Sequence, residues 1–203
     1  MTENGALTIG LMRHFQTDWN AAHLLQGRTD RPLTDAARVR LSELPIPDPW
    51  ATARLIATPP SRASATAPIL YRQVPEIEPA LTELSWGAWE GQSGADLLED
   101  PNSGYDHVET WGWDKAPPGG ESPNAAWARI GPALRQIAEN RRPSLLVVHR
   151  GVMRVIMAKA WGWNFDSPEP FRIKRERIYP IHLNADGCPI GHGAEARLLE
   201  RDV

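Results

Sequence analysis

Short apolar runs recur along the chain, separated by segments with helical spacing. The runs at residues 7–12 (LTIGLM), 54–58 (RLIAT) and 144–148 (SLLVV) have no helical period and are short enough for buried strands. Two more strand-like runs stand at residues 178–183 and 196–199. The pattern therefore predicts five strands, spread over most of the chain.

Helices are predicted between these strands. Thr34 and Ser61 are candidate N-caps, Ser61 for a helix that runs to about Tyr71. Residues 151–161 are apolar almost throughout and favour another helix. Residues 121–140 keep helical spacing in spite of two prolines, with apolar positions at Ala125, Trp127, Ile130, Leu134 and Ile137. The alternation predicts an α/β fold, a three-layer sandwich whose mostly parallel sheet is covered on both faces.

Composition narrows the class of protein. A chain of 203 residues with 41% hydrophobic and 23% charged residues is typical of one globular domain, which we expect to span residues 1–203. The single cysteine, Cys188, excludes an internal disulfide and a multi-cysteine metal site. The N-terminal residues resemble no signal peptide and the apolar runs are too short to cross a bilayer, so we expect a cytoplasmic protein without a membrane partner.

The net charge of −3 offers no general attraction to nucleic acid, so a bound anion needs a local cluster of cations. Such clusters follow three predicted strands, as Arg13-His14, Ser61-Arg62 and His149-Arg150. In open α/β sheets, ligands bind at the carboxyl ends of the strands, so these side chains are expected at one edge. Arginines and histidines together suit an oxyanion such as phosphate.

The same residue types suit phosphoryl transfer. A neutral imidazole can attack phosphorus and form a covalent intermediate, and nearby arginines oppose its protonation. Arginines also stabilise the charge that develops on the phosphoryl oxygens. A carboxylic acid is then needed to protonate the leaving oxygen and later to activate water. On spacing alone Glu78, Glu83 and Glu90 are all candidates for that acid.

Five blocks, in the same order, resemble the histidine phosphatase superfamily, the phosphoglycerate mutase-like group. The opening pattern R-H-G-[EQ]-T-x-W-N, Q-G and D-x-P-L-T is similar to residues 13–20 (RHFQTDWN), Gln26-Gly27 and residues 30–34 (DRPLT). The pattern S-P-x-x-R-A-x-x-T-A resembles residues 58–67 (TPPSRASATA). The later blocks stand at residues 81–91 (LTELSWGAWEG), 118–122 (PGGES) and 148–151 (VHRG).

The resemblance implies a role for each matching residue. His14 would be the phosphorylated nucleophile, and Glu83, rather than Glu78 or Glu90, would donate a proton to the leaving group. The phosphate pocket would be completed by Arg13, Arg62 and His149. Asn20 would bond the phosphoryl group, and Gln26 and Gly27 would line the approach of the substrate. No metal and no organic cofactor is implied, and the other histidines are expected to have no role, with His107 the foremost exception.

Two positions depart from the family pattern. Phe15 stands where the family has glycine, and it would be strained if the backbone there required a positive φ. At the second histidine the usual S-H-G-G has become Val148-His149-Arg150-Gly151, which removes a hydroxyl and adds a positive charge. Both changes bear on rate and specificity.

A lid-like insertion is expected at about residues 84–120. Its stretch 92–118 carries six acidic residues against Lys115 alone, which disfavours a second strongly anionic phosphoglycerate. The sequence therefore favours a phosphatase of small phosphate monoesters over a mutase. A degenerate phosphate-binding member with little turnover stays an alternative, because of Phe15. Substrate stacking on Trp111 or Trp113 is a further hypothesis, and a homodimer is compatible with the sequence.

Overall fold

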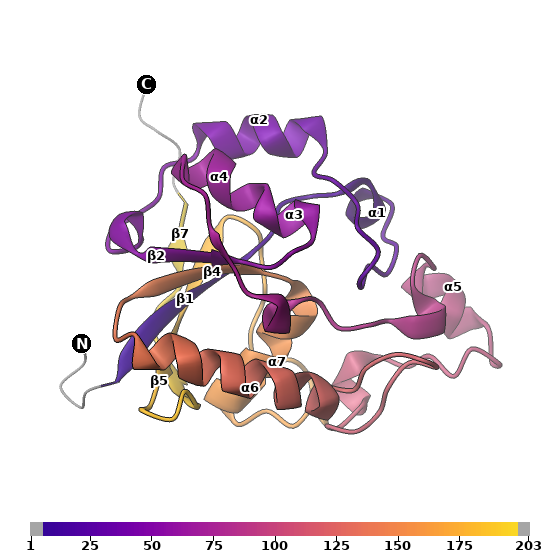
Figure 1. Cartoon of the computed structure of the whole chain (residues 1–203). Coiled ribbons are helices and arrows are strands. Elements are labelled where there is room, and N and C mark those ends of the chain that lie inside the picture. The colour runs from indigo at the N-terminus through magenta and orange to yellow at the C-terminus, as the bar shows by residue number, and fades with distance from the viewer. Residues whose placement is uncertain (1–5, 199–203) are drawn as a thin grey trace.

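A twisted sheet lies between two layers of helices in the computed structural model, which describes residues 6–198 (Figure 1). The sheet order is β3-β2-β4-β1-β5-β6, and β7 also pairs with β5. The strands β1 to β4 pair in parallel, whereas β5 is antiparallel to β1, β6 and β7. The strands are β1 (Leu7–Arg13), β2 (Arg54–Ala57), β3 (Glu76–Ile77), β4 (Ser144–Val148), β5 (Arg177–Leu183), β6 (Pro189–His192) and β7 (Ala196–Arg197).

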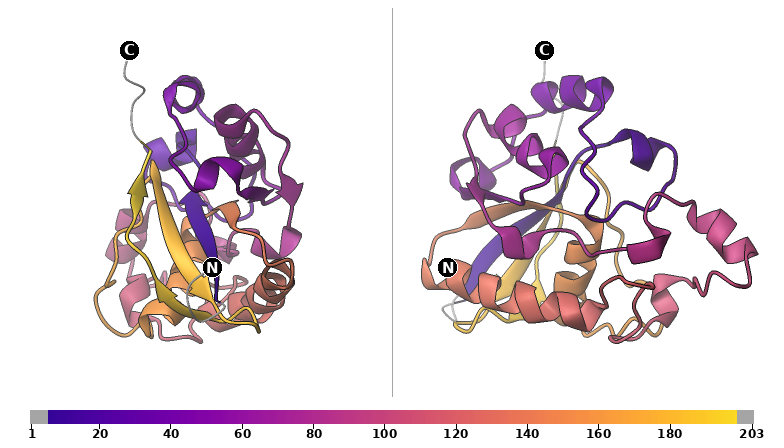
Figure 2. Two further views of the ribbon diagram at one scale, coloured as in Figure 1. Left: turned by 90° about the vertical axis from the view of Figure 1, so that its left-hand side faces the viewer. Right: turned by 45° about the vertical axis from the view of Figure 1, so that its right-hand side comes forward.

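The predicted α/β architecture is confirmed, and Figure 2 shows the sheet from two further sides. One face is covered by α2 (Asp35–Glu43), α3 (Ser61–Ser64) and α4 (Thr66–Tyr71), and the other by α6 (Pro123–Glu139) and α7 (Arg150–Trp161). The remaining elements are short: α1 (Asp18–Ala21), α5 (Gly94–Glu99) and the 3₁₀ turns η1 (Trp50–Thr52), η2 (Pro79–Leu81), η3 (Gly87–Trp89) and η4 (Val108–Thr110).

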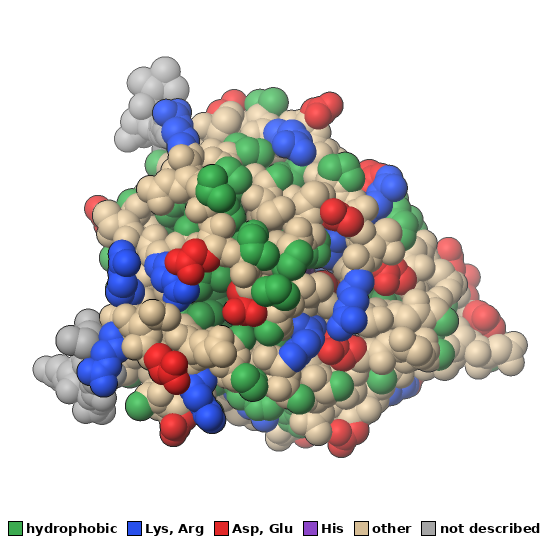
Figure 3. All heavy atoms as spheres, in the orientation of Figure 1, with side chains coloured by type: hydrophobic (Ala, Val, Ile, Leu, Met, Phe, Trp, Pro, Cys, Tyr) green, Lys and Arg blue, Asp and Glu red, His purple; other side chains and the backbone are tan. Residues whose placement is uncertain are grey.

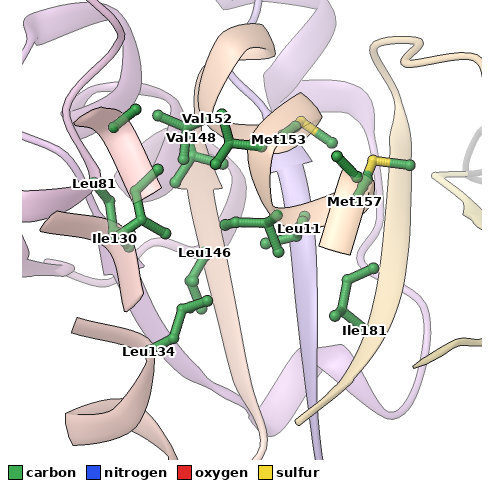
Figure 4. Close-up of a cluster of buried hydrophobic side chains, with 14 of the residues drawn as sticks. Leu11, Leu81, Ile130, Leu134, Leu146, Val148, Val152, Met153, Met157 and Ile181 are labelled. Atoms are coloured by element: carbon green, nitrogen blue, oxygen red, sulfur yellow. The ribbon is translucent and has the colours of Figure 1, made fainter. Parts of the chain in front are cut away.

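Two hydrophobic cores, one on each face, follow from the alternation of side chains along the central strands. In β4, Leu146 and Val148 pack toward α6 and α7, whereas Leu145 and Val147 pack toward α2 and α4. Figure 4 shows the first of these cores, where Leu146 lies among side chains of α6, α7 and β1. Every residue of β4 is buried, as a continuous apolar run in a parallel sheet predicts.

Several local predictions are refined by the structure. Thr34 caps α2 as predicted and accepts a hydrogen bond from the Ala37 amide. Ser61 does not cap a helix: it is the first residue of α3, and its amide and hydroxyl both donate to Asp30. The helix predicted to continue to Tyr71 is divided into α3 and α4. In α6, Ala126 is buried, whereas Ala125, which was predicted on the apolar face, is exposed. The last predicted strand was expected to reach Leu199, which lies outside the described residues.

The carboxyl ends of three neighbouring strands meet at one edge. Arg13 pairs with Val148 across β1 and β4, and Ala57 of β2 pairs with Val147. The next residues along each strand therefore face the same edge. Segment 84–120, which contains η3, α5 and η4, extends beyond this edge (Figure 1). Within the part of the chain that the structure describes, no helix is long and apolar enough to cross a membrane.

Leu146 tests how far the fold depends on the core between the sheet and α6 and α7. Leu146→Ala is expected to lower the free energy of unfolding by about 2–5 kcal/mol, because it leaves a cavity in a fully buried site. The measurement is urea-induced unfolding, with an unchanged m-value. Leu98→Ala in α5, where the side chain is 44% exposed, is the matched control and should change stability by less than about 1 kcal/mol. Equal losses in both variants would contradict this account of the core.

Candidate active site

His14 lies at the end of β1 with its imidazole buried and its orientation fixed. Its amide continues the sheet by donating to the Val148 carbonyl at 2.9 Å. Its Nδ1 lies 2.6 Å from the Phe15 carbonyl, which can only accept, so Nδ1 carries the proton and Nε2 has a free lone pair. Burial, followed by the charges of His149, Arg13 and Arg62, holds the pKa of His14 well below its usual value. The imidazole is therefore neutral at physiological pH.

Phe15 does not strain the backbone, contrary to the concern raised by its replacement of glycine. Its φ is outside the left-handed region, and its amide donates to the Thr66 hydroxyl at 3.3 Å. The ring is buried in the core beneath α2 and α4, away from the cavity that His14 lines. At this position a large apolar side chain is accommodated as part of the core.

His149 and Arg62 lie behind His14 rather than on the cavity wall. The rings of His14 and His149 are 5.1 Å apart, between centroids. His149 accepts at Nδ1 from the Arg62 Nε, at 3.2 Å, and its Nε2 is 2.6 Å from the Thr58 hydroxyl. The other nitrogens of Arg62 donate to the carbonyls of Gly27 and Thr29. The predicted direct contact of both residues with phosphate therefore requires them to exchange some of these bonds.

Arg13 lines the cavity and forms no ion pair with any of residues 6–198. Its Nε is buried and has no hydrogen-bond partner among the described residues. Burial, and after it the charges of Arg175 and Arg150, lower the pKa of Arg13 to about 9. The guanidinium stays charged at neutral pH. A buried cation in this state is stabilised by any anion that enters the cavity.

Glu83 lies at the N-terminus of α7 and also lines the cavity. Its carboxyl group accepts hydrogen bonds from the amides of Leu84, Gly151 and Val152, at 2.9–3.2 Å. Burial raises the pKa of Glu83, and the three amides and Arg62 only partly offset that effect. The environment favours a carboxylic acid that can exist in its protonated form at higher pH than an exposed glutamate. Neither Glu78 nor Glu90 lines the cavity.

Asn20 and Gln26 form one polar group on the wall of the cavity. The Gln26 Oε1 accepts from the Thr17 hydroxyl at 2.7 Å and from the Asn20 Nδ2 at 3.1 Å, which leaves the Gln26 Nε2 as a buried donor with no partner among the described residues. The Asn20 Oδ1 accepts from Arg175 at 2.7 Å. Both amides thus keep an N–H available for a ligand.

Gly27 follows Gln26 where the chain passes very close to the 84–86 segment. A Cβ on Gly27 would lie 2.8 Å from the Leu84 carbonyl oxygen, so only glycine fits without displacement of backbone. Glu90 accepts from the amides of Gly27 and Thr29, and Arg62 donates to their carbonyls. Gly27 does not itself line the cavity, but the loop on which it lies does, through Leu24, Leu25 and Gln26. Gly27 holds the turn that positions Arg62.

These side chains surround one cavity of about 590 Å³. Its lining confirms the predicted convergence of His14, Arg13 and Glu83, and it includes Asn20 and Gln26. His107 lines it too. Residues that sequence analysis did not assign to it also line it, among them His23, Trp86, Tyr105, Arg154 and Arg175. Of these, only Arg154 had a usable signal, because it lies one helical turn after Arg150 on α7.

The acidic character of the lid does not extend into the cavity. Of the acidic residues in stretch 92–118, Glu109 alone lines it. Asp106 pairs with Lys115, and acidic side chains gather at the end of the molecule where α5 projects (Figure 3). Most of the acidic charge that the sequence places in the lid therefore lies outside the cavity.

Trp111 and Trp113 do not line the cavity, so the hypothesis that they stack on the substrate is wrong for this structure. Trp111 is buried against Trp86 and Trp89, and its indole N–H donates to the Asp106 carbonyl. Trp113 packs against Phe165 and Lys159. Both rings stabilise the base of the lid. Among residues 6–198, no group of three or more His, Cys, Asp or Glu side chains is arranged to hold a metal ion.

The profile of the histidine phosphatase superfamily (branch 1) matches residues 9–192. The adenosylcobalamin/alpha-ribazole phosphatase of Escherichia coli is 27% identical over 187 residues, which cover 88% of this chain and 91% of that protein. Glucosyl-3-phosphoglycerate phosphatase of Mycobacterium tuberculosis is 27% identical over 163 residues, 73% of this chain and 72% of that protein.

Solved structures of similar proteins have the same fold as this chain. The alpha-ribazole phosphatase of Shigella flexneri superposes with a TM-score of 0.74 at 23% identity, covering 95% of this chain and 96% of that chain. A mycobacterial glucosyl-3-phosphoglycerate phosphatase gives a TM-score of 0.73 at 22% identity, and the match covers 93% of this chain and 96% of that chain. The match of the profile over most of the chain is the evidence for descent: the chain belongs to the histidine phosphatase superfamily, branch 1.

Proposed function

We propose that this protein is a phosphatase that hydrolyses small phosphate monoesters through a phosphohistidine at the Nε2 of His14. The observation that carries the proposal is the state of His14. Its imidazole is neutral, its Nδ1 is bonded to the Phe15 carbonyl, and it lines a cavity that also contains the uncompensated cation of Arg13. The relatives named as phosphatases support the same reaction class.

In the first half-reaction, Nε2 attacks phosphorus and the bond from phosphorus to the ester oxygen breaks. Glu83 gives its proton to that oxygen, and the alcohol leaves. Arg13 stabilises the charge on the phosphoryl oxygens. In the second half-reaction, the Glu83 carboxylate accepts a proton from water while the water oxygen attacks phosphorus. The N–P bond breaks, inorganic phosphate leaves, and His14 and Glu83 return to their starting states.

The remaining site residues position these groups. His149 and Arg62 keep the space behind His14 positively polarised, which opposes protonation of the nucleophile. Asn20 and Gln26 supply amide N–H donors at the wall of the cavity. Because the arginines supply the neutralising charge, we propose that no metal ion takes part. The unstrained packing of Phe15 favours turnover over a degenerate phosphate-binding module.

His14→Ala is expected to abolish hydrolysis of p-nitrophenyl phosphate, with a loss in kcat of at least about a thousandfold, because the variant lacks the Nε2 that attacks phosphorus in the proposed first step. Rapid quenching of the wild type should leave the mass of one phosphoryl group on the peptide that contains His14. His192→Ala, on β6 outside the cavity, is the control and should keep wild-type activity. Turnover that persists in His14→Ala would refute the assignment of the nucleophile.

Glu83→Gln should affect substrates according to their leaving groups. With alkyl phosphates kcat should fall by about a hundredfold or more, because the alcohol must be protonated as it leaves. With p-nitrophenyl phosphate the first step needs little acid assistance, so a burst of one equivalent of nitrophenol should precede a slow steady state. Stopped-flow absorbance measures the burst. Equal losses on both classes of substrate, without a burst, would contradict the acid role.

The pH dependence has a predicted sign. The pKa of Glu83 is raised, so the acid form needed for the first step persists toward neutral pH and activity falls as pH rises through that pKa. The pKa of His14 is lowered, so the neutral nucleophile is retained as pH falls below the usual histidine value. Profiles of kcat for an alkyl phosphate should therefore lose their alkaline decline in Glu83→Gln. A decline that is identical in both proteins would exclude Glu83 as its cause.

Gly151→Ala tests the position of the Glu83 carboxylate. A Cβ there would lie 2.5 Å from the Glu83 Oε1, so the carboxylate must move and kcat should fall by about ten- to a hundredfold. Gly131→Ala in α6 is the matched control, because its Cβ would meet nothing closer than 3.5 Å. That variant should keep full activity and gain about 0.5–1 kcal/mol of stability. Full activity in Gly151→Ala would show that this contact does not hold the acid in place.

A further inference from the structure

The cavity contains more positive charge than one phosphoryl group requires. Four arginines line it: Arg13 at the end of β1, Arg150 and Arg154 on successive turns of α7, and Arg175 in the loop before β5. Arg13 adjoins the nucleophile in sequence and serves the phosphoryl group under the proposed function. The other three come from elements after the second histidine, and no family motif includes Arg154 or Arg175.

The carboxylates present compensate only part of this charge. Glu169 pairs with Arg154 at 2.9 Å and with Arg150 at 3.5 Å, so one carboxylate serves two guanidinium groups. Within residues 6–198, Arg175 forms no ion pair: its one side-chain hydrogen bond goes to the Asn20 Oδ1, and its Nε is buried without a partner. Burial lowers the pKa of both Arg150 and Arg175, and repulsion adds to it, from Arg154 at Arg150 and from Arg150 at Arg175. Such crowding of cations is relieved by a bound anion.

The size of the cavity leaves room for that anion to belong to the substrate. A volume of about 590 Å³ lies in the range of sites that hold entire small molecules, well beyond a phosphate group. The alcohol part of a bound ester therefore lies within the cavity, in the presence of the remaining arginines. A planar guanidinium binds carboxylate or phosphate oxygens in pairs, which gives both affinity and orientation.

We propose that the substrate carries a second anionic group, a carboxylate or a second phosphate, on its alcohol part, and that Arg150 and Arg175 bind it. This inference rests on the proposed function, because the orientation of the substrate follows from a reacting phosphate placed at His14 and Arg13. Glu169, which pairs with both Arg150 and Arg154, holds the position of Arg150. Arg150 stands where the family pattern has glycine, so this cation of the second site is a departure from that pattern.

Two esters that differ at one carbon test the proposal. 3-Phosphoglycerate has a carboxylate where glycerol 3-phosphate has a hydroxymethyl group. The wild type should have a kcat/KM for 3-phosphoglycerate at least about tenfold above that for glycerol 3-phosphate, which is the expected contribution of one charge-assisted hydrogen bond. In Arg150→Ala and Arg175→Met the ratio should fall toward one. Arg172→Ala, an exposed residue of the same loop that does not line the cavity, should keep the wild-type ratio.

A second pair of esters separates carboxylate from phosphate. Propanediol 1,3-bisphosphate is compared with propanediol monophosphate in the same way. A preference for the bisphosphate alone assigns the site to a second phosphate, and preference in both pairs assigns it to anions of either kind. A wild-type ratio near one in both pairs, or ratios unchanged in Arg150→Ala and Arg175→Met, would overturn the proposal.

Binding to the His14→Ala protein keeps this test independent of turnover. Calorimetry should give a Kd for 3-phosphoglycerate at least about tenfold below that for glycerol 3-phosphate, and the difference should vanish when Arg175→Met is added. If the wild type hydrolyses none of the esters, including p-nitrophenyl phosphate, the proposed function fails and calorimetry still decides the second anion site. If it hydrolyses p-nitrophenyl phosphate but neither test shows a preference, the second site alone fails.

Discussion

The parallel pairing of β1 with β4 is the constraint on which the site depends. Both strands end at the same edge, and the amide of His14 extends their ladder by one more bond, to the Val148 carbonyl. The histidines that follow the two strands are consequently held with their rings 5.1 Å apart, although they are far apart in sequence. Every other element of the site is placed relative to this pair: β2 brings Thr58 to His149, and α7 begins directly after it. A loop could not fix two imidazoles with comparable accuracy.

Burial next to these strand ends sets three protonation states at once. It lowers the pKa of both His14 and Arg13, yet the two residues end in opposite states because their intrinsic values differ so widely. The imidazole becomes neutral, whereas Arg13, at about 9, remains a cation. The same burial raises the pKa of Glu83. The first half of the proposed reaction needs a neutral nucleophile, a cation that binds the phosphoryl group and an acid that keeps its proton toward higher pH, and burial shifts Glu83 in that last direction.

Sequence reasoning succeeded where the signal was local or carried by a motif. Apolar runs located the central strands, Thr34 was a correct cap, and the convergence of His14, Arg13 and Glu83 followed from strand ends and the family pattern. It failed where the direction of a side chain decides whether that side chain lines the cavity. Counting acidic residues in the lid says nothing of which way they point, and the indole of Trp111 packs into the core against Trp86 and Trp89 instead of lining the cavity. Arg175 carried no signal, because no spacing rule relates a loop before β5 to α1.

The departure at the second histidine, His149-Arg150-Gly151, shows how a fixed site leaves room for specificity. The two positions after His149 differ in what lies against them. At Gly151 a Cβ would meet the carboxylate of Glu83 at 2.5 Å, so a side chain there displaces the proposed acid. At Arg150 the side chain is 44% exposed and lines the cavity, so a large cation is tolerated without disturbing α7 or Glu83. Of the two positions, only that of Arg150 can vary while the proposed chemistry is preserved, and its side chain lines the cavity. Under the proposed second anion site, charge added at Arg150 would change which esters are favoured while the proposed nucleophile and acid stay in place.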